Sequence, residues 1–557
     1  MRLKRRGIKL LALFLGLSLV AAACGSDDNE GSGTTTEGTE APDGSAGGDF
    51  IDLGTIVGDP LEHIDPALNS TLDGYQIINS IYDGLTDIDA TDPASPKIVP
   101  HVAESYEAND DASVWTFKIR EGQTFAGGEE ILPSTFQRSW ERAADLAGDY
   151  SYLLTFIDGG AERLDGTADT LSGVKVDDEA MELIVTLDAP YSNFDAVSGF
   201  QLFMPTPEEA VAAGEDWENQ PMFGNGAYKM ETARNDEEIK IVKSDEWAGD
   251  YNGDTWDDRL DSITFRVTAD PDTSFNSFEA GEGDNGSIPP ARVADIEGTY
   301  GNTLGVSILG SYHFVLNDRA PEIGGEENLK LRQAVSMAID REEINEAVYN
   351  GSRTTSTGIT PPGIPGFKEG ICEFCTYDAA GAKALFEEWQ AEGNTQAAPL
   401  PIQFNADAGH EPVVAIIVDN LAAAGIEAAA TPIDGETYFS QLADGVCVIC
   451  RAGWFADYPT YDNFMFDLFH STSLDGNNFG FVNDEFDALV DEAKQTTDKD
   501  AQAALFQEAE GILLNDATMA IPINWYRGDY VYDEDKVANF PQTNFGLILW
   551  EQVKFAA

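Results

Sequence analysis

Apolar and polar residues follow two different periods along this chain, one typical of strands and one typical of helices. Residues 114–122, VWTFKIREG, alternate apolar with polar side chains and predict a half-buried strand. Apolar residues at helical spacing over 75–85 predict a helix that ends at Gly84. Residues 134–146, STFQRSWERAADL, predict an amphipathic helix whose N-cap is Ser134. Both kinds of element are therefore expected in the first half of the chain.

The second half alternates helices and strands more regularly. Residues 328–351 predict two helices joined by a turn, and 378–393 predict a helix capped by Asp378. The next three segments predict a strand, a helix and a strand, at 400–409, 411–426 and 427–434. A strand pattern returns at 520–533. This rhythm is typical of a layered lobe, so the predicted fold class is α/β.

The N-terminus has the pattern of a secretory signal. Five Lys and Arg residues lie within 1–9, and the apolar run over 10–23 is too short for a transmembrane helix. Because the run ends in AAAC, residues 1–24 are expected to be a lipoprotein signal peptide with Cys24 as the lipidated residue. The alternative is a plain signal peptide with an incidental cysteine. Residues 25–49 are rich in Gly, Ser, Thr and acidic residues and predict a flexible tether at the extracytoplasmic face of a bacterial membrane.

The charge balance is strongly acidic, with 32 Lys and Arg against 99 Asp and Glu and a net charge of −67. Nucleic acid is not an expected partner, because phosphate binding needs a basic surface. Acidic residues spread along the whole chain indicate a solvated surface more than one cation site.

The four cysteines after Cys24 form two CxxC pairs, Cys372 with Cys375 and Cys447 with Cys450. Disulfides are the simplest account outside the cytoplasm, and structural zinc and free thiols are the alternatives. Whether the bonds form within each CxxC or between the two does not follow from the sequence.

The motifs of common enzymes and cofactor sites are missing from the sequence. The five histidines form no HExxH or H-x3-H pattern, so no metal site is expected. The sequence has no GxSxG elbow, P-loop or GxGxxG, so acyl transfer, nucleotide hydrolysis and dinucleotide binding lack their machinery. We therefore expect neither an enzyme nor a bound cofactor.

Five motifs occur in order along the chain. They are VPHVAESYEANDDASVWTFKIREGQTF (99–125), SWER (139–142), GNGAYKM (224–230), LRQAVSMAIDREEI (331–344) and RAGWFADYP (451–459). Together they resemble the large peptide- and nickel-type solute-binding proteins of ABC importers (family 5), and the last motif resembles the oligopeptide-binding branch. One departure is AGGEEILP (126–133), where the family commonly has Asp-Gly followed by a Thr-initiated helix.

The resemblance implies a type II periplasmic-binding-protein-like clamp, in which two lobes close on a ligand and a smaller domain is inserted in the first lobe. The expected boundaries are 50–85, 205–308 and 519–557 for the first lobe, 86–204 for the inserted domain and 309–518 for the second lobe. The implied function is a receptor that captures short peptides and delivers them to ABC permease subunits in the membrane. We expect a monomer.

Asp457 is the central site residue that the resemblance implies. In the oligopeptide-binding relatives, the aspartate of this motif receives the α-amino group of the peptide. A buried carboxylate needs a partner, and a ligand ammonium supplies one. Trp454 and Tyr458 would exclude water and strengthen that ion pair. The alternative is that Asp457 caps a loop and the aromatic residues belong to the core.

Arg451 and His410 are the candidates for binding the ligand carboxylate. Arginine suits bidentate recognition of a carboxylate, and His410 lies at a place that resembles the family's. The alternatives are a structural salt bridge for Arg451 and a surface position for His410. The segment that contains Asp73 and Gly74 is expected across the cleft, where it would pair with the ligand backbone as an added strand does.

Two other functions fit the same resemblance. A receptor of this fold for a sugar oligomer, an opine or a metal chelate would not need Asp457, and a sensory lipoprotein would use the same clamp to signal. The sequence does not give the ligand's length or side-chain preference.

Overall fold

The computed structural model describes residues 48–556 except 59–60, 90–95, 251–252, 254–255, 257, 301, 407 and 474–478. The expected signal peptide, Cys24 and all but the last two residues of the expected tether lie outside the described residues. Within the described chain, no helix is long and apolar enough to cross a membrane.

The two ends of the described chain share one hydrophobic core. A four-stranded sheet is formed, in spatial order, by β1 (Asp49–Asp52), β10 (Ser262–Arg266), β9 (Glu238–Lys243) and β8 (Tyr228–Met230). Phe50 from β1 packs against Trp550 near the C-terminus, with ring centroids 5.4 Å apart. This core also contains Ile77 and Ile78 of the helix α1 (Leu72–Ile81), which lies beside the sheet.

The helix α1 (Leu72–Ile81) ends three residues before the predicted stop at Gly84, so that prediction was wrong. The next residue is extended, and the carbonyl of Ile81 accepts a hydrogen bond from the Gly226 N–H at 2.8 Å. Gly84 has a different role, because a Cβ at this position would lie 2.8 Å from the carbonyl oxygen of Gly199. A tertiary contact, not the glycine, therefore sets the end of the helix.

A second four-stranded sheet is formed by β4 (Ala103–Ala108), β5 (Val114–Ile119), β7 (Glu182–Thr186) and β6 (Val174–Asp177), in this spatial order. The strand predicted over 114–122 is β5, and its residues alternate between half-buried and buried. This sheet packs with α2 (Pro133–Leu146) around a core that contains Phe117, Phe136 and Trp140.

The helix α2 begins at Pro133, and its N-cap is Leu132, two residues before the predicted cap at Ser134. Proline suits the first helical position, because its missing N–H would have no partner inside the helix. The Thr135 hydroxyl accepts a hydrogen bond from the Leu132 N–H at 3.1 Å, and Ser134 lies inside the first turn.

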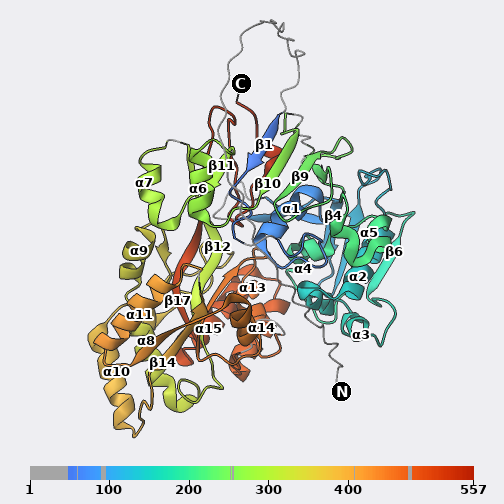
Figure 1. Ribbon diagram of the computed structural model, residues 1–557. Helices are drawn as coiled ribbons and strands as arrows, with labels where there is room; N and C mark the ends of the chain where they lie inside the picture. The colour runs from blue at the N-terminus through green and yellow to red at the C-terminus, as the bar shows by residue number, and fades with distance from the viewer. Residues whose placement is uncertain are drawn as a thin grey trace, which may run out of the picture. The chain divides into compact units, whose positions relative to one another are not determined.

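The largest sheet has seven strands, and two long antiparallel strands run through it side by side (Figure 1). Its spatial order is β11 (Asn285–Ser287), β17 (Ala520–Tyr532), β12 (Thr303–Leu316), β16 (Ile449–Phe455), β14 (Leu400–Asn405) and β15 (Ala428–Ile433), with β13 (Thr354–Thr355) beside β17. The long pair, β12 and β17, joins Thr303 to Val531 at one end and Val315 to Ala520 at the other.

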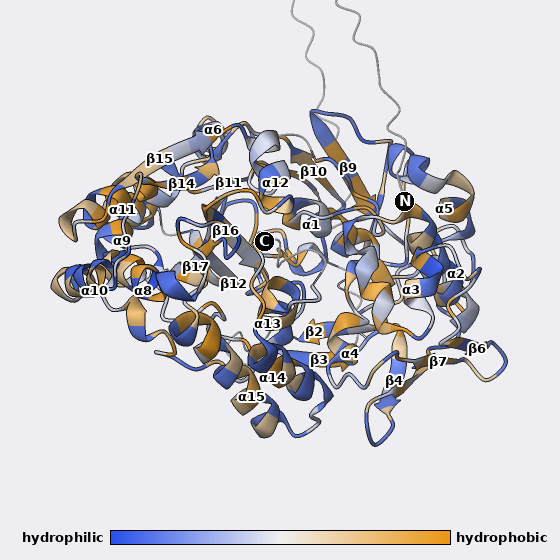
Figure 2. Ribbon diagram, turned by 90° about the horizontal axis from the view of Figure 1, so that it is seen from below, coloured by the Kyte–Doolittle hydropathy of each residue, from blue (hydrophilic) through white to orange (hydrophobic). Residues whose placement is uncertain are grey.

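The helices of the second half cover this sheet and confirm the predicted α/β class. They are α8 (Leu329–Ala338), α9 (Arg341–Tyr349), α10 (Ala379–Ala391), α11 (Glu411–Ala423), α12 (Gly435–Ala443), α13 (Asp462–Phe469), α14 (Asp484–Gln495) and α15 (Lys499–Gly511). The strands β14 and β15 are parallel and are connected through α11. Figure 2 shows hydrophilic and hydrophobic residues mixed along the turns of α14 and α15, as expected of amphipathic helices.

Shorter elements connect these three sheets. They are the hairpin of β2 (Thr86–Asp89) and β3 (Lys97–Pro100), and the helices α3 (Gly160–Leu164), α4 (Phe194–Val197), α5 (Glu208–Ala213), α6 (Pro271–Glu279) and α7 (Val293–Glu297).

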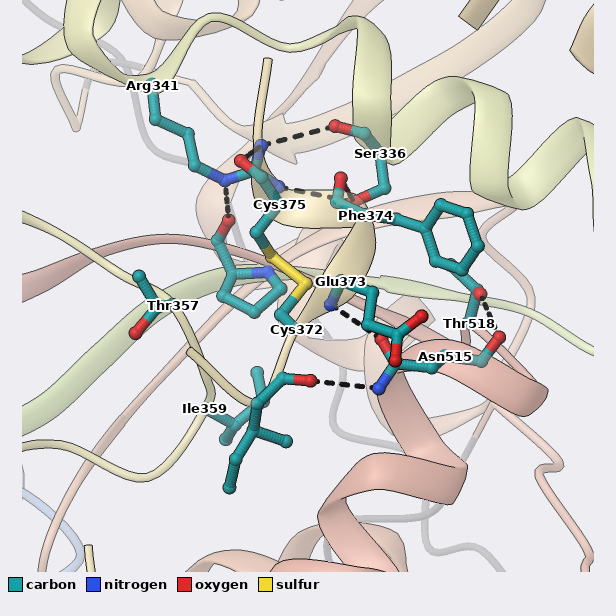
Figure 3. Close-up of a disulfide and its surroundings, with 12 residues drawn as sticks. Ser336, Arg341, Thr357, Ile359, Cys372, Glu373, Phe374, Cys375, Asn515 and Thr518 are labelled. Carbon is teal, nitrogen blue, oxygen red and sulfur yellow. Dashed lines mark hydrogen bonds between the residues drawn. A yellow bond between two sulfur atoms is a disulfide. The ribbon is translucent and has the colours of Figure 1, made fainter. Parts of the chain in front are cut away.

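Both CxxC pairs form disulfides, Cys372–Cys375 and Cys447–Cys450. Asn515 links the first one to the end of α15, because its amide donates to the Ile371 carbonyl at 2.9 Å and accepts from the Glu373 N–H at 2.8 Å (Figure 3). The described residues contain no group of three or more potential metal ligands. Each disulfide therefore joins the two cysteines of one CxxC, which answers the question of pairing that the sequence left open.

Candidate functional site

A cavity of about 400 Å³ lies between elements that are far apart in the sequence. Tyr75 of α1 and Phe200 line this cavity, and the centroids of their rings are 5.5 Å apart. Two further lining residues are Asp457, which follows β16 in the chain, and Phe545, which lies near the C-terminus of the chain. Pockets of this size, with aromatic walls and a few polar groups, are typical of ligand sites.

Asp457 is held by residues from two parts of the chain. Its Oδ1 accepts a hydrogen bond from the Tyr150 hydroxyl at 2.8 Å, and its Oδ2 accepts from the Asn463 amide at 3.0 Å. The Asp457 N–H donates to the side-chain oxygen Oδ1 of Asn463 at 3.0 Å, which fixes the loop between β16 and α13. Both of these side-chain donors are neutral groups that orient the carboxylate.

The aromatic neighbours of Asp457 have separate surroundings. The Trp454 indole donates to Asn463 at 3.0 Å, and its ring lines a smaller cavity of about 130 Å³. Tyr458 is 1% exposed and donates to Asp467 at 2.7 Å. Burial raises the pKa of Asp467, and of Tyr458 well above its ordinary value. Asp467 also accepts a hydrogen bond from the Asn463 amide at 2.9 Å, so Trp454 and Asp467 together orient Asn463.

Arg451 and His410 come together around Tyr312. The Arg451 guanidinium lies 5.0 Å from the Tyr312 ring and donates to the Tyr526 hydroxyl at 3.0 Å. The Tyr312 hydroxyl and His410 Nδ1 are 3.1 Å apart. Among the described residues, Arg451 forms no ion pair with a carboxylate, which argues against a structural salt bridge. His410 is buried at the N-cap of α11 and not at the surface; burial, followed by Arg451, lowers its pKa to about 3.

Sequence reasoning missed Arg353, which lies in a loop without a motif. Its guanidinium stacks 5.5 Å from the Tyr526 ring and 5.3 Å from the Tyr349 ring. Its Nε and Nη1 are buried and have no hydrogen-bond partner within the described chain. Burial lowers the pKa of Arg353. With Arg451, it places two guanidinium groups at Tyr526, which lines a further cavity of about 270 Å³.

Asp73 and Gly74 do not line the main cavity, whereas the next residue, Tyr75, does. Asp73 lies in the first turn of α1, where burial, followed by Asp52, raises its pKa to about 7. Gly74 packs against the preceding loop, since a Cβ there would lie 1.9 Å from the Asn69 side chain. A direct contact of these two residues with a ligand stays a prediction.

Comparisons with known proteins point to one family. Residues 97–476, more than half of the chain, match the family described as bacterial extracellular solute-binding proteins, family 5 Middle. The oligopeptide-binding protein OppA of Bacillus subtilis is 26% identical over 551 residues, covering 94% of this chain and 95% of the relative. The heme-binding protein A of Haemophilus influenzae is 26% identical over 490 residues, covering 81% and 83%.

A solved structure supports the same assignment at the level of the fold. Haemophilus influenzae OppA in complex with RPPGFSPFR has a TM-score of 0.75 and 22% identity, covering 92% of this chain and 99% of that chain. The family is one of solute-binding proteins, which agrees with the expectation that the chain is not an enzyme. This chain belongs to the bacterial extracellular solute-binding proteins of family 5.

Proposed function

We propose that this protein is the extracytoplasmic, lipid-anchored receptor of an ABC importer, which captures short peptides and delivers them to a membrane permease. The family and a relative named for oligopeptide binding support this proposal. The observation that carries it is the placement of opposite charges. Asp457 lines one cavity, while Arg451 and Arg353 flank Tyr526 at another without an ion pair within the described chain. A short peptide carries an ammonium and a carboxylate, so it matches both.

The proposed mechanism is closure of two lobes on the peptide, in which binding favours the closed state. The division into a first lobe, an inserted domain and a second lobe is part of this proposal, at 50–85 with 205–308 and 519–557, at 86–204, and at 309–518. The hydrogen bond from Tyr150 to Asp457 supports it, because it joins the inserted domain to the second lobe beside the cavity.

The test is a double-mutant cycle between Asp457 and the peptide α-amino group. Asp457→Asn keeps the shape of the side chain and removes its charge, and N-terminal acetylation removes the charge of the peptide. Each change alone should cost about 3 to 5 kcal/mol, or about two to four decades in affinity. Both together should cost much less than the sum, because the two charges interact directly. Isothermal titration calorimetry of the four combinations gives the coupling.

Asp484→Asn is the matched control, because Asp484 is an exposed carboxylate at the start of α14. It should leave all affinities within about a factor of two, as expected of an isolated surface charge. If acetylation leaves affinity unchanged while Asp457→Asn unfolds the protein, Asp457 is structural and the peptide assignment loses its main support.

A receptor for a non-peptide solute is the second candidate function. It is favoured by the heme-binding relative, which covers 81% of this chain at an identity similar to that of the oligopeptide-binding one. Native mass spectrometry of protein purified without refolding separates the two. A retained mass that fragments into amino acids supports the peptide receptor, and a macrocycle or saccharide mass supports the alternative.

The lipid anchor is tested separately at Cys24. Acyl chains contribute about 0.8 kcal/mol per buried CH2, so the Cys24→Ala protein should leave the membrane fraction. Tight retention of this variant in high salt would contradict the anchor without affecting the peptide proposal.

A further inference from the structure

The wall of the main cavity is acidic to a degree that the peptide α-amino group alone does not explain. Six of its lining residues are Asp or Glu, and none of the lining residues is Lys or Arg. The six acidic residues are Asp83, Asp87, Asp89, Asp250, Asp457 and Glu551. One ammonium at Asp457 would leave the other five carboxyl groups of the cavity without a ligand charge.

The hairpin of β2 and β3 assembles the centre of this wall. Thr86 pairs with Pro100, which brings His101, just after β3, beside Asp83 and Asp87. His101 Nε2 lies 3.5 Å from Asp83 Oδ2, and its Nδ1 lies 3.7 Å from Asp87 Oδ2. One imidazole carries at most one positive charge, so it cannot balance both carboxylates.

Two polar side chains of the cavity have hydrogen-bonding atoms without partners among the described residues. His101 is 8% exposed, and its Nε2 makes no hydrogen bond although it lies near Asp83. Gln542 is oriented through its amide nitrogen, which donates to the Gly546 carbonyl at 3.1 Å, and this leaves its buried Oε1 without a donor. Buried polar atoms without partners are costly, and a ligand with several N–H donors would satisfy an acceptor of this kind.

The remaining walls suit the aliphatic stem of a long cationic side chain. Tyr75, Phe200 and Phe545 line the cavity, and the Trp247 indole donates to Asp83 at 3.0 Å. Aromatic faces bind both methylene groups and cations. Burial raises the pKa of Asp83 to about 6 and that of Glu551 to about 8.

We propose that this cavity binds the cationic side chain of a lysine or arginine residue of the captured peptide, which makes the protein a receptor for basic peptides. This inference rests on the proposed peptide function and adds a substrate class to it. A metal ion is a poorer match, because the described residues contain no cluster of three or more potential ligands.

Calorimetry with a matched set of tripeptides tests the proposal on the wild-type protein. Each position in turn carries lysine, norleucine or glutamate, so that lysine and norleucine share a stem and differ in charge. At one position at least, lysine should bind tenfold or more tightly than norleucine, and glutamate more weakly than norleucine. A ratio of lysine to norleucine within twofold at all three positions would overturn the inference.

Variants of the cavity carboxyl groups then test whether the preference for lysine arises in this cavity. Asp87→Asn and Glu551→Gln should each lower the ratio of lysine to norleucine at the preferred position by at least threefold, and leave the penalty for N-terminal acetylation unchanged. Asp236→Asn is the control, because it removes one exposed carboxylate and tests the general field of the acidic surface. If Asp236→Asn lowered the ratio of lysine to norleucine affinity by the same factor, the preference for lysine would not arise in the cavity, and the inference would be overturned.

Two outcomes of the peptide titrations distinguish this inference from the proposed function. If peptides bind and acetylation weakens them, but no position prefers lysine, the peptide function stands and the basic preference is wrong. If no peptide binds, both are wrong.

Free spermidine and butylguanidine carry the same cationic groups without a peptide backbone. If either competes with an affinity equal to that of the lysine tripeptide, the cavity takes a free cation in place of a side chain.

Discussion

Asp457 and Asp462 are five residues apart, and both accept hydrogen bonds from residues 149–197, yet their surroundings differ. Asp457 lines the main cavity and is held by neutral donors from Tyr150 and Asn463. Asp462, the first residue of α13, is 2% exposed and accepts from the Asn193 amide at 2.7 Å and from the Tyr191 hydroxyl.

The protein supplies its own cations around Asp462. Lys494 Nζ lies 3.3 Å from the centre of the Phe466 ring and 4.9 Å from that of Tyr191. Lys499 Nζ donates to the Asn193 side chain at 2.6 Å. We call Tyr191, Asn193, Asp462, Lys494 and Lys499 the latch, in which Asp462 is buried, Lys494 is half-buried and Lys499 is exposed. In the latch, lysines of the chain balance the charge of Asp462, whereas the lining of the main cavity contains no Lys or Arg. These two carboxylates, five residues apart, thus have different surroundings, and we propose that Asp462 serves the structure and Asp457 the ligand.

The largest expected effect that separates the two regions is on stability. Asp462→Asn removes a buried negative charge next to Lys494, whose pKa is already lowered by burial. We expect a loss of about 3 to 5 kcal/mol in the free energy of unfolding, because the half-buried Lys494 ammonium then lacks one of its balancing charges. Urea unfolding followed by tryptophan fluorescence measures it.

Asp457→Asn is the matched variant in the same experiment. It should change the free energy of unfolding by less than about 1 kcal/mol, since an asparagine still accepts from Tyr150. Equal destabilisation by the two variants would contradict the division between latch and ligand site.

A matched pair of tyrosines gives a smaller effect of the same kind. Tyr191→Phe removes a donor from buried Asp462 and should cost about 1.5 to 3 kcal/mol, the range for a hydrogen bond to a charged group. Tyr150→Phe removes a donor from Asp457 at the cavity, where water replaces it, and should cost less than about 1 kcal/mol. Thermal unfolding of both variants at one pH is sufficient. A larger loss of stability in Tyr150→Phe than in Tyr191→Phe would mean that Asp457, and not Asp462, makes the hydrogen bond that matters more for stability.

The α/β class could be predicted from periodicity, because β5, β14, β15 and β17 keep their patterns locally. The ends of elements could not, since they depend on tertiary contacts. The carbonyl of Ile81 is taken by Gly226 from a distant segment, and this contact is invisible in the spacing over 75–85.

The candidate site shows the same limit. Asp457, Arg451 and His410 could be proposed because each lies in a segment that resembles a family motif. The acidic wall could not, because Asp83, His101 and Glu551 are far apart in a sequence with 99 acidic residues, where any pair of them is uninformative. Arg353 was missed because a stacked guanidinium without a carboxylate partner leaves no local pattern.

The smallest expected effect is the pH dependence of the binding of a basic peptide to the main cavity. In the unliganded cavity, burial raises the pKa of Asp83 to about 6 and that of Glu551 to about 8. A bound cation lowers both pKa values, so the complex holds fewer protons than the free protein. Acid therefore opposes binding. The pKa of His101 is raised by Asp83 and Asp87 against the effect of burial, so this group also gains positive charge as the pH falls.

Besides His101, the titratable groups that line this cavity are carboxyl groups and two tyrosines. The carboxyl groups are those of Asp83, Asp87, Asp89, Asp250, Asp457 and Glu551; burial keeps Tyr75 and Tyr82 neutral by raising their pKa. The advantage of a lysine peptide over its norleucine analogue should fall about tenfold between pH 8 and pH 5.5, because one pKa unit corresponds to about 1.4 kcal/mol. Calorimetry in buffers of different ionisation enthalpy should also show proton release on binding at pH 7. The latch provides the contrast, since Asp462→Asn should leave this pH dependence unchanged. An advantage that stays constant or rises in acid would mean that the carboxyl groups of the cavity do not meet the ligand's charge.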